Sequence, residues 1–166
     1  MKKIIISAVA KNRVIGKSNG EMPWHSKEEF QHFKKMTFGY PVIMGRVTYE
    51  TLGKPLKGRL NIIISQNKKL NYAFEDVKIF HSLDDAFVFC ENKNCEKVFI
   101  IGGAKIYGLA LKSADEMIIS IMDFEVDGDV FFPVIDNEVW KVESTDKRNE
   151  FEIFYYVRRN KYVDKN

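Results

Sequence analysis

The stretch KVFIIGGAKIY (97–107) passes from an apolar, β-rich run through two glycines into a helical pattern. The stretch PVIMGRVTYETLG (41–53) has the same organisation, with one glycine between the apolar run and the helical pattern. Apolar runs bounded by glycine are typical of buried strands, and glycine allows the tight turn that follows. Both stretches therefore predict a strand, over residues 97–103 and 41–45, that leads directly into a helix, and we expect the two helices to begin at Ala104 and Thr48, respectively.

Outward from these two stretches, strands and helices alternate along most of the chain. The other expected strands are apolar, β-rich runs and cover residues 4–9, 61–65, 77–80 and 116–122. The other expected helices have a serine at their start and cover residues 26–37 and 83–91. Residues 12–24 lack periodicity and predict a long loop, of a kind that often serves function. Residues 140–161 alternate apolar and other side chains, which predicts an antiparallel hairpin.

This alternation favours an α/β fold, with a largely parallel sheet, helices on both of its faces and the terminal hairpin as an antiparallel edge. No linker or internal repeat divides the sequence, so we expect a single domain over residues 1–166. The chain is 45% hydrophobic, which suffices for one substantial core without disulfides or metals.

Composition and charge exclude several classes of protein. Charged residues make up 30% of the chain, and they are interspersed, so we expect no membrane segment. The net charge of +3 comes without a long basic run, which argues against a nucleic-acid binder and suits a small anionic substrate. The N-terminal apolar run is too short for a secretion signal.

Metal-binding and disulfide patterns are also missing from the sequence. Cys90 and Cys95 do not form a Cys-x-x-Cys pair; we expect a buried thiol and a loop thiol, and a reducing compartment. His25, His32 and His81 are scattered, and we expect each to lie on the surface or in a loop. The sequence therefore predicts no metal site.

Glu29 is the most informative single residue. On a helical wheel it lies about 40° from the centre of the apolar stripe formed by Phe30, Phe33 and Met36, so it should point inward. A buried carboxylate is costly without a partner. Either Glu29 closes a capping box with Ser26, three residues earlier, or it serves a ligand. The wheel alone leaves both open.

Two further features suggest a ligand site. Arg46, Thr48 and Lys105 lie at the two strand-to-helix turns, where backbone N–H groups and the helix dipole favour anions. Neither turn has the GxGxxG pattern, and tight turns with surface cations would explain them as well. The apolar residues 22–24 precede the helix that carries Glu29; they either shield a reaction from water or simply anchor the loop.

Taken in order, the motifs of this chain resemble those of the dihydrofolate reductase family. The matching strings are VIG (14–16), MPW (22–24), PVIMGRVTYETLG (41–53), PLKGRLNIIIS (55–65), IIGGAKIY (100–107) and DGDVFFP (127–133). Each string is weak alone, but the ordered set is specific and spans nearly the whole chain. The resemblance implies an eight-stranded, mostly parallel mixed sheet with four flanking helices. It also implies a cytoplasmic enzyme that reduces dihydrofolate with NADPH and binds antifolate inhibitors. The lack of a heptad pattern favours a monomer.

The resemblance assigns roles to individual residues. Glu29 matches the acidic residue that binds the pterin's 2-amino group and N3, Ser120 the hydroxyl that supports it, and Arg59 the arginine that grips the tail carboxylate. Met22 and Trp24 belong to the mobile loop, which Asp129 holds closed. Implied substrate contacts are Ile6, Ala8, Glu29, Phe30, Phe33, Leu52, Leu56, Arg59 and Ser120. Implied cofactor contacts are Ala8, Ile15, Gly16, Gly45, Arg46, Val47, Thr48, Ser65, Gln66, Ile101, Gly102, Gly103, Ala104, Lys105, Ile106 and Tyr107, with a cis peptide expected at Gly102-Gly103.

Some positions depart from the family pattern. The loop before Met22 is one residue longer than in compact bacterial members, and the pocket acid is Glu where many of them have Asp. Val47 and Gln66 stand where some members bind the 2′-phosphate, although Arg46 and Lys105 still favour NADPH over NADH.

Two alternatives remain at this stage. The NADPH-dependent reductase of riboflavin synthesis has a related fold, but its substrate needs neither an acid at the pterin edge nor Arg59. A non-catalytic folate- or nucleotide-binding module would bind the cofactor without oxidising it.

Overall fold

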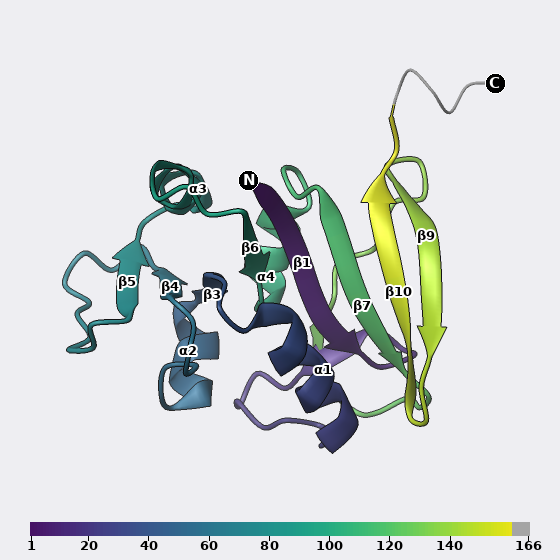
Figure 1. Cartoon of the computed structure of the whole chain (residues 1–166). Coiled ribbons are helices and arrows are strands. Elements are labelled where there is room, and N and C mark those ends of the chain that lie inside the picture. Colours follow the sequence, from purple (N-terminus) through teal and green to yellow (C-terminus); the bar gives the residue numbers. More distant parts are fainter. Residues whose placement is uncertain (161–166) are drawn as a thin grey trace.

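The computed structural model describes residues 1–160, and its centre is an eight-stranded sheet (Figure 1). The strand order is β5-β4-β3-β6-β1-β7-β10-β9, and β2 and β8 form a separate two-stranded sheet. The strands are β1 (Lys2–Val9), β2 (Val14–Gly16), β3 (Val42–Gly45), β4 (Asn61–Ile64), β5 (Val77–Phe80), β6 (Lys97–Ile100), β7 (Glu116–Met122), β8 (Val130–Phe131), β9 (Trp140–Lys147) and β10 (Phe151–Arg158).

The first six strands in this spatial order, β5-β4-β3-β6-β1-β7, pair in parallel, while β10 runs antiparallel to both β7 and β9. The predicted mostly parallel sheet with a terminal antiparallel hairpin is thus confirmed. Strand β6 lies between β1 and β3 and is parallel to both. The carboxyl ends of these three strands therefore lie side by side at one edge of the sheet. Ligands of open α/β sheets bind at such an edge.

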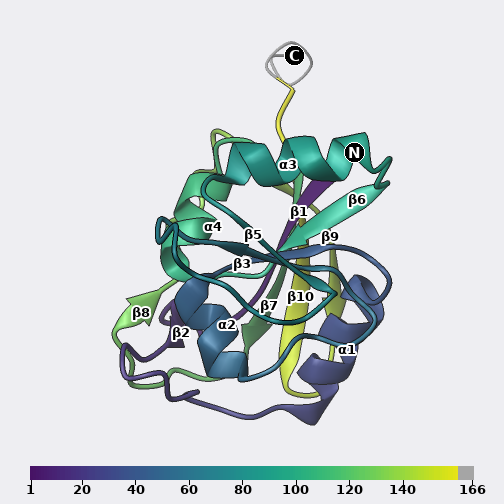
Figure 2. The same ribbon diagram turned by 90° about the vertical axis from the view of Figure 1, so that its left-hand side faces the viewer.

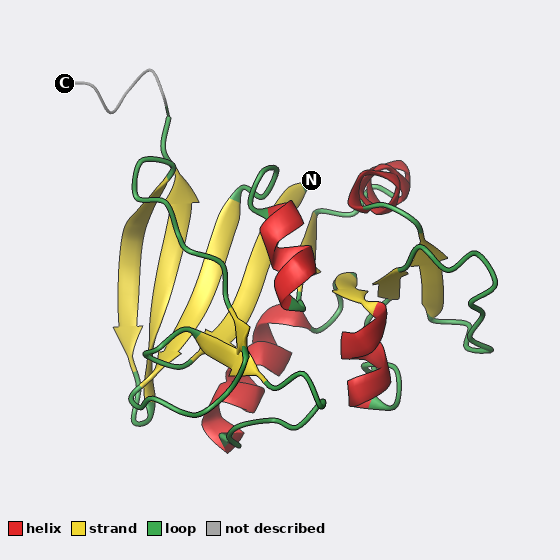
Figure 3. Cartoon of the chain, turned by 180° about the vertical axis from the view of Figure 1, so that it is seen from behind, coloured by secondary structure: helices red, strands yellow, loops and turns green. Residues whose placement is uncertain are grey.

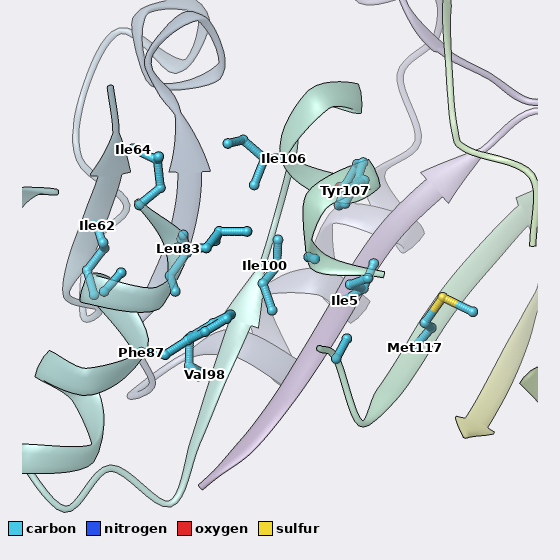
Figure 4. Packing of buried hydrophobic residues seen from close by; sticks show 14 of the residues in the cluster. Ile5, Ile62, Ile64, Leu83, Phe87, Val98, Ile100, Ile106, Tyr107 and Met117 are labelled. Atoms are coloured by element: carbon cyan, nitrogen blue, oxygen red, sulfur yellow. The ribbon is translucent and has the colours of Figure 1, made fainter. Parts of the chain in front are cut away.

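Helices cover both faces of the sheet (Figures 2 and 3). Residues 1–160 contain α1 (Lys27–Thr37), α2 (Arg46–Leu52), α3 (Leu83–Asn92) and α4 (Ala104–Ala110). One core cluster packs α3 and α4 onto the sheet through Leu83, Phe87, Ile106 and Tyr107 (Figure 4). A second cluster lies on the other face, where Phe33 and Met36 of α1 pack against it. The helix positions are therefore fixed by burial on both sides of β1.

Several predicted boundaries needed correction. The second helix begins at Arg46, two residues before the predicted Thr48, directly after β3. The expected loop 12–24 contains β2, which pairs with β8, and neither of these two strands was predicted. The strand predicted over 97–103 ends at Ile100, since Gly102 adopts a φ of 115° that no strand accommodates. The end of the hairpin expected at Lys161 lies outside the described residues.

Helix α1 begins as predicted and buries one residue that was expected outside. Ser26 caps the helix, and its side chain accepts a hydrogen bond from the amide of Glu29. His32 is only 7% exposed, so its expected surface position was wrong. Its Nε2 has no hydrogen-bond partner among residues 1–160, and its ring centroid lies 6.4 Å from that of Phe151, where β10 begins. The terminal hairpin covers this side of α1.

Burial of His32 should make the protein less stable in acid. Its pKa is lowered by burial and then by the Arg148 cation, while Asp146 opposes this shift. Because the folded-state pKa lies below the ordinary value of about 6.5, the unfolded chain binds more protons, and stability falls as the pH drops below that value. His32→Leu should therefore lose less stability than the wild type between pH 7 and pH 5 in urea denaturation.

The contribution of other titrating groups cancels in this comparison, because they are the same in both proteins. Equal losses of stability in the two proteins would contradict the assignment to His32. His25→Leu, at an exposed position just before α1, is the matched control and should keep the wild-type pH dependence.

Candidate active site

A cavity of about 1440 Å³ runs along the carboxyl edge of the sheet. Its walls come from the ends of β1, β3 and β4, from α1 and α2, from the start of α4 and from the loop over residues 16–24. These walls are mainly apolar, with a small number of polar groups at their edges. Such a cavity suits an elongated ligand that combines flat rings with charged ends.

Glu29 faces this cavity from α1 and is partly buried. The hydroxyl of Ser120 hydrogen-bonds its carboxyl group. Ser120 is on β7, paired with Ala8 of β1 and Ile153 of β10, so the sheet register fixes this support. Burial raises the pKa of Glu29 to about 7, and the Ser120 bond opposes the shift. The carboxyl group is therefore poised to change charge near neutral pH.

The sequence left open whether Glu29 closes a capping box with Ser26 or serves a ligand. One of the two hydrogen bonds of a capping box is present. Ser26 Oγ accepts from the amide of Glu29 at 3.3 Å. The carboxyl group of Glu29, however, meets Ser120 inside the cavity. The ligand-facing alternative for Glu29 is thus the one that the geometry favours.

Arg59 marks the outer end of the same wall. Its Nη1 donates to Oγ1 of Thr37 at 3.0 Å, and its Nε donates to the carbonyl of Lys57 at 3.1 Å. The guanidinium carbon lies 5.9 Å from the ring centroid of Phe33 and 6.0 Å from that of Phe38. Burial lowers the pKa of Arg59, which nevertheless stays charged. A fixed, planar cation of this kind suits a carboxylate.

The two strand-to-helix turns lie against each other on the opposite wall. The amide of Gly45 donates to the carbonyl of Gly102 at 2.8 Å, and the expected cis peptide joins Gly102 to Gly103. A Cβ on Gly103 would lie 3.3 Å from Oγ1 of Thr48, so a side chain there would fit tightly and only if Thr48 shifted. Neither α2 nor α4 has a side-chain cap at its start. These first amides are free to meet an anion.

The loop that carries Met22 is tied to the loop before β8. The amide of Ser18 donates to Oδ1 of Asp129 at 2.7 Å, and the hydroxyl of Ser18 donates to the other carboxylate oxygen. These bonds hold the pKa of Asp129 below its usual range. Met22 is 59% exposed at the rim of the cavity. Asp129 thus makes the loop contact that the sequence predicted for it.

The structure brings the predicted site residues together. All of those assigned to substrate or cofactor line the one cavity except Ser120, which lies beneath it and reaches Glu29. Phe30, a member of the predicted apolar stripe, is 50% exposed where it lines the cavity. Other residues that line the cavity were not predicted, among them Ser7, Ser18, Lys34, Thr51, Asn67 and His81. His81 directly follows β5, as Ser65 directly follows β4. Because ligands bind at the carboxyl ends of parallel strands, this position could have been predicted from the sequence.

The structure is an α/β fold whose one long cavity has two different walls. The starts of α2 and α4 with their glycines form the first, which we call the nucleotide wall, and α1 with Arg59 forms the second. Comparison with known proteins identifies the family. The family model described as dihydrofolate reductase matches residues 3–161. The chain belongs to the dihydrofolate reductase family.

Individual relatives are similar over nearly the whole chain. Dihydrofolate reductase of Staphylococcus haemolyticus is 36% identical over 162 residues, covering 95% of each chain. That of Neisseria gonorrhoeae is 44% identical over 150 residues, covering 89% of this chain and 90% of the relative. A solved structure of the Enterococcus faecalis dihydrofolate reductase, complexed with NADP(H) and RAB-propyl, superposes with a TM-score of 0.84 at 28% identity, covering 96% of this chain and 97% of that one.

Proposed function

We propose that this chain reduces 7,8-dihydrofolate to 5,6,7,8-tetrahydrofolate with NADPH, in support of one-carbon metabolism and thymidylate and purine synthesis. The observation that carries this proposal is a carboxyl group of raised pKa, that of Glu29, in a cavity that also holds two uncapped, glycine-lined helix starts. One proton is consumed for each hydride transferred: the hydride goes to pterin C6 and the proton to N5.

In this proposal Glu29 binds the pterin edge formed by the 2-amino group and N3. Since that edge faces away from N5, Glu29 orients and polarises the ring, and water delivers the proton. Phe30, Phe33, Leu52 and Leu56 line the same cavity and supply the apolar walls along the pterin and the benzoyl group. An apolar wall excludes water from the ring and strengthens the interaction with Glu29.

The nucleotide wall fits a dinucleotide phosphate. NADPH, when bound, supplies the hydride. The uncapped starts of α2 and α4, with the glycines beside them, would hold its phosphates, and Arg46 and Lys105 add positive charge nearby. Ser65 and Gln66 line the cavity farther along the edge of the sheet, after β4. The Arg46 guanidinium already pairs with Glu50 at 2.7 Å, which orients it on α2.

Arg59 should determine affinity for the substrate tail rather than turnover. Replacing Arg59 by Met removes a charged hydrogen-bonding partner worth about 1.5–3 kcal/mol, so we expect the KM for dihydrofolate to rise roughly 10- to 100-fold. The kcat and the affinity for NADPH should stay within about three-fold, because the group acts equally in ground and transition states. Steady-state kinetics and a cofactor titration measure these quantities.

Lys57→Met is the matched control, since it removes an exposed cation from the same loop. A similar rise of the KM in both variants would show that general charge attraction, and not the fixed guanidinium, binds the tail.

The direct test of the proposed function follows NADPH absorbance when purified protein meets dihydrofolate, with NADH in parallel. Rapid, dihydrofolate-dependent oxidation that prefers NADPH supports the proposal. Oxidation only with a ribityl-phosphate pyrimidine would support the riboflavin-pathway alternative. Binding of NADPH without any oxidation would support a non-catalytic module.

The setting of the enzyme is part of the proposal. No helix among residues 1–160 is long and apolar enough to span a membrane. Cys90 and Cys95 are both free thiols, the first buried and the second partly exposed, as expected for a reducing compartment. We therefore place the enzyme in the cytoplasm, as a monomer whose substrate cavity also accepts antifolate inhibitors.

A further inference from the structure

The turn between β9 and β10 touches the start of α1, although 124 residues separate the two contacting positions (Figures 1 and 2). The hydroxyl of Ser26 donates to Oε2 of Glu150 at 2.6 Å. Ser26 is 4% exposed, whereas Glu150 lies at the exposed tip of the hairpin. No step of the proposed reaction uses this contact.

Glu150 is presented from a fixed turn. Its carbonyl accepts from the amide of Asp123 at 3.0 Å, just after β7. The amide of Arg148 donates to the carbonyl of Phe151 at 2.8 Å, which closes the hairpin. Phe151 is fully buried and pairs with Met122 of β7. The carboxylate is therefore anchored to the same sheet that carries Ser120, the hydrogen-bond partner of Glu29.

The contact leads directly to Glu29. A serine hydroxyl has a single hydrogen, and Ser26 gives it to Glu150. The lone pairs of Ser26 Oγ are then left to accept from the Glu29 amide, which they do at 3.3 Å. Hydrogen bonds arranged in a chain polarise and strengthen one another. A carboxylate near a helix N-terminus is also favoured by the helix dipole.

The other side of Glu29 is held by the sheet. Its carboxyl group meets Ser120 on β7, and its backbone is held through Ser26 by a residue anchored to that strand. The first turn of α1 is thus fixed relative to β7 at two points, and Ser26 is also the residue at which the loop carrying Met22 and Trp24 passes into the helix.

We infer that Glu150 is a positioning residue: through Ser26 it fixes the first turn of α1, and with it the place of the Glu29 carboxyl group in the cavity. This inference rests on the proposed function for its kinetic readout. Loss of the contact lets the helix start move away from the sheet, which loosens the grip on the pterin edge and admits water to Glu29.

The test compares Glu150→Ala, Glu150→Gln and Ser26→Ala. Glu150→Ala should raise the KM for dihydrofolate about five-fold, the net effect of one typical hydrogen bond, and leave the dissociation constant of NADPH unchanged. Glu150→Gln should restore the KM to within about two-fold, since an amide oxygen still accepts from Ser26. Ser26→Ala combined with Glu150→Ala should match Ser26→Ala alone, because both changes break the same chain of bonds.

A pH titration separates positioning from a merely structural role. With more water around the carboxyl group, the inflection that Glu29 gives to kcat/KM should move to lower pH in Glu150→Ala. Carbon-13 NMR titration of the Glu29 carboxyl group in the ligand-free protein makes the same comparison without turnover. It therefore remains decisive even if the assay with dihydrofolate fails in the wild type, which would overturn the proposed function alone.

Glu143→Ala is the matched control, since it removes an exposed carboxylate from β9 on the same hairpin. The inference is overturned if Glu150→Ala keeps the wild-type KM and the wild-type Glu29 titration. It is equally overturned if Glu143→Ala shows the same changes, or if affinity for NADPH falls in step with that for dihydrofolate.

Discussion

Replacing Glu29 by Gln is expected to lower kcat/KM for dihydrofolate at pH 7 by about 100-fold or more, the usual effect of removing a preorganised polar group at a reacting ring. The amide keeps the size of the side chain but presents a donor where the pterin edge offers donors of its own. The dissociation constant of NADPH should not change, because Glu29 lies on the wall formed by α1. Stopped-flow hydride transfer and a cofactor fluorescence titration measure the two quantities.

The same variant should make the ligand-free protein more stable in alkali. The pKa of Glu29 is raised from 4.5 to about 7, so the folded state binds more protons than the unfolded state between these values. Stability is therefore lost as the pH rises through this window, and the full penalty, roughly 3 kcal/mol at 1.36 kcal/mol per pH unit, acts above pH 7. Glu29→Gln should remove this penalty at pH 8 and change little at pH 4.5 in urea denaturation.

Glu28→Gln tests the specificity of both effects. It neutralises the neighbouring carboxylate, which does not line the cavity. We expect neither the kinetic loss nor the alkaline stabilisation from it. If Glu29→Gln kept full activity, its assigned role would be wrong; if it gained no stability at pH 8, Glu29 would be ionised at little cost in the folded protein. The two readouts together distinguish a functional carboxylate from a structural one.

Helix α1 shows which side-chain positions the sequence predicts and which it does not. The wheel correctly turned Glu29 inward, and Phe30 of the same stripe lines the cavity, but the expected surface position of His32 was wrong. The apolar pattern does not say which strands of the sheet, or which open spaces, lie against the helix. In the structure the cavity leaves Phe30 half-exposed, and His32 lies against β10, which begins at Phe151. Contacts between residues so far apart in the chain leave no local pattern.

The length of an element decides whether its pattern is visible. The apolar runs 77–80 and 116–122 were predicted with the bounds that β5 and β7 have. The pair β2 and β8, of three and two residues, is too short to show the alternation of a strand and was missed. Their pairing nonetheless holds the loop over the cavity beside Asp129.

Some residues of the candidate site are recognisable from local sequence, and others are not. The glycine turns and Glu29 were marked by local chemistry, and the ordered family motifs supplied the rest. Ser120 illustrates what no local pattern gives: its contact with Glu29 depends on the register of β7 against β1 and β10. Side chains that face one another across a sheet follow from register, which a single sequence does not specify for non-adjacent strands.

Gly102→Ala should have the largest effect on the nucleotide wall. The backbone of Gly102 has a φ of 115°, which side chains other than glycine rarely adopt, at a cost of about 1–3 kcal/mol. A Cβ there would also lie 3.1–3.2 Å from two ring carbons and the hydroxyl oxygen of Tyr107. That ring is 4% exposed, and its hydroxyl donates to the carbonyl of Ile6 at 2.8 Å, so it cannot move aside.

The backbone must therefore give way in Gly102→Ala, and the start of α4 turns its amides out of the cavity. We expect the dissociation constant of NADPH to rise about 30-fold, equivalent to about 2 kcal/mol, and the melting temperature to fall. Gly108→Ala, in the same helix with nothing within 4 Å of its added Cβ, should leave NADPH binding unchanged and stabilise the helix slightly. If Gly102→Ala bound NADPH as the wild type does, the Gly102–Gly103 turn would contribute to folding and not to NADPH binding. The start of α2 would then be the part of the nucleotide wall that binds the cofactor.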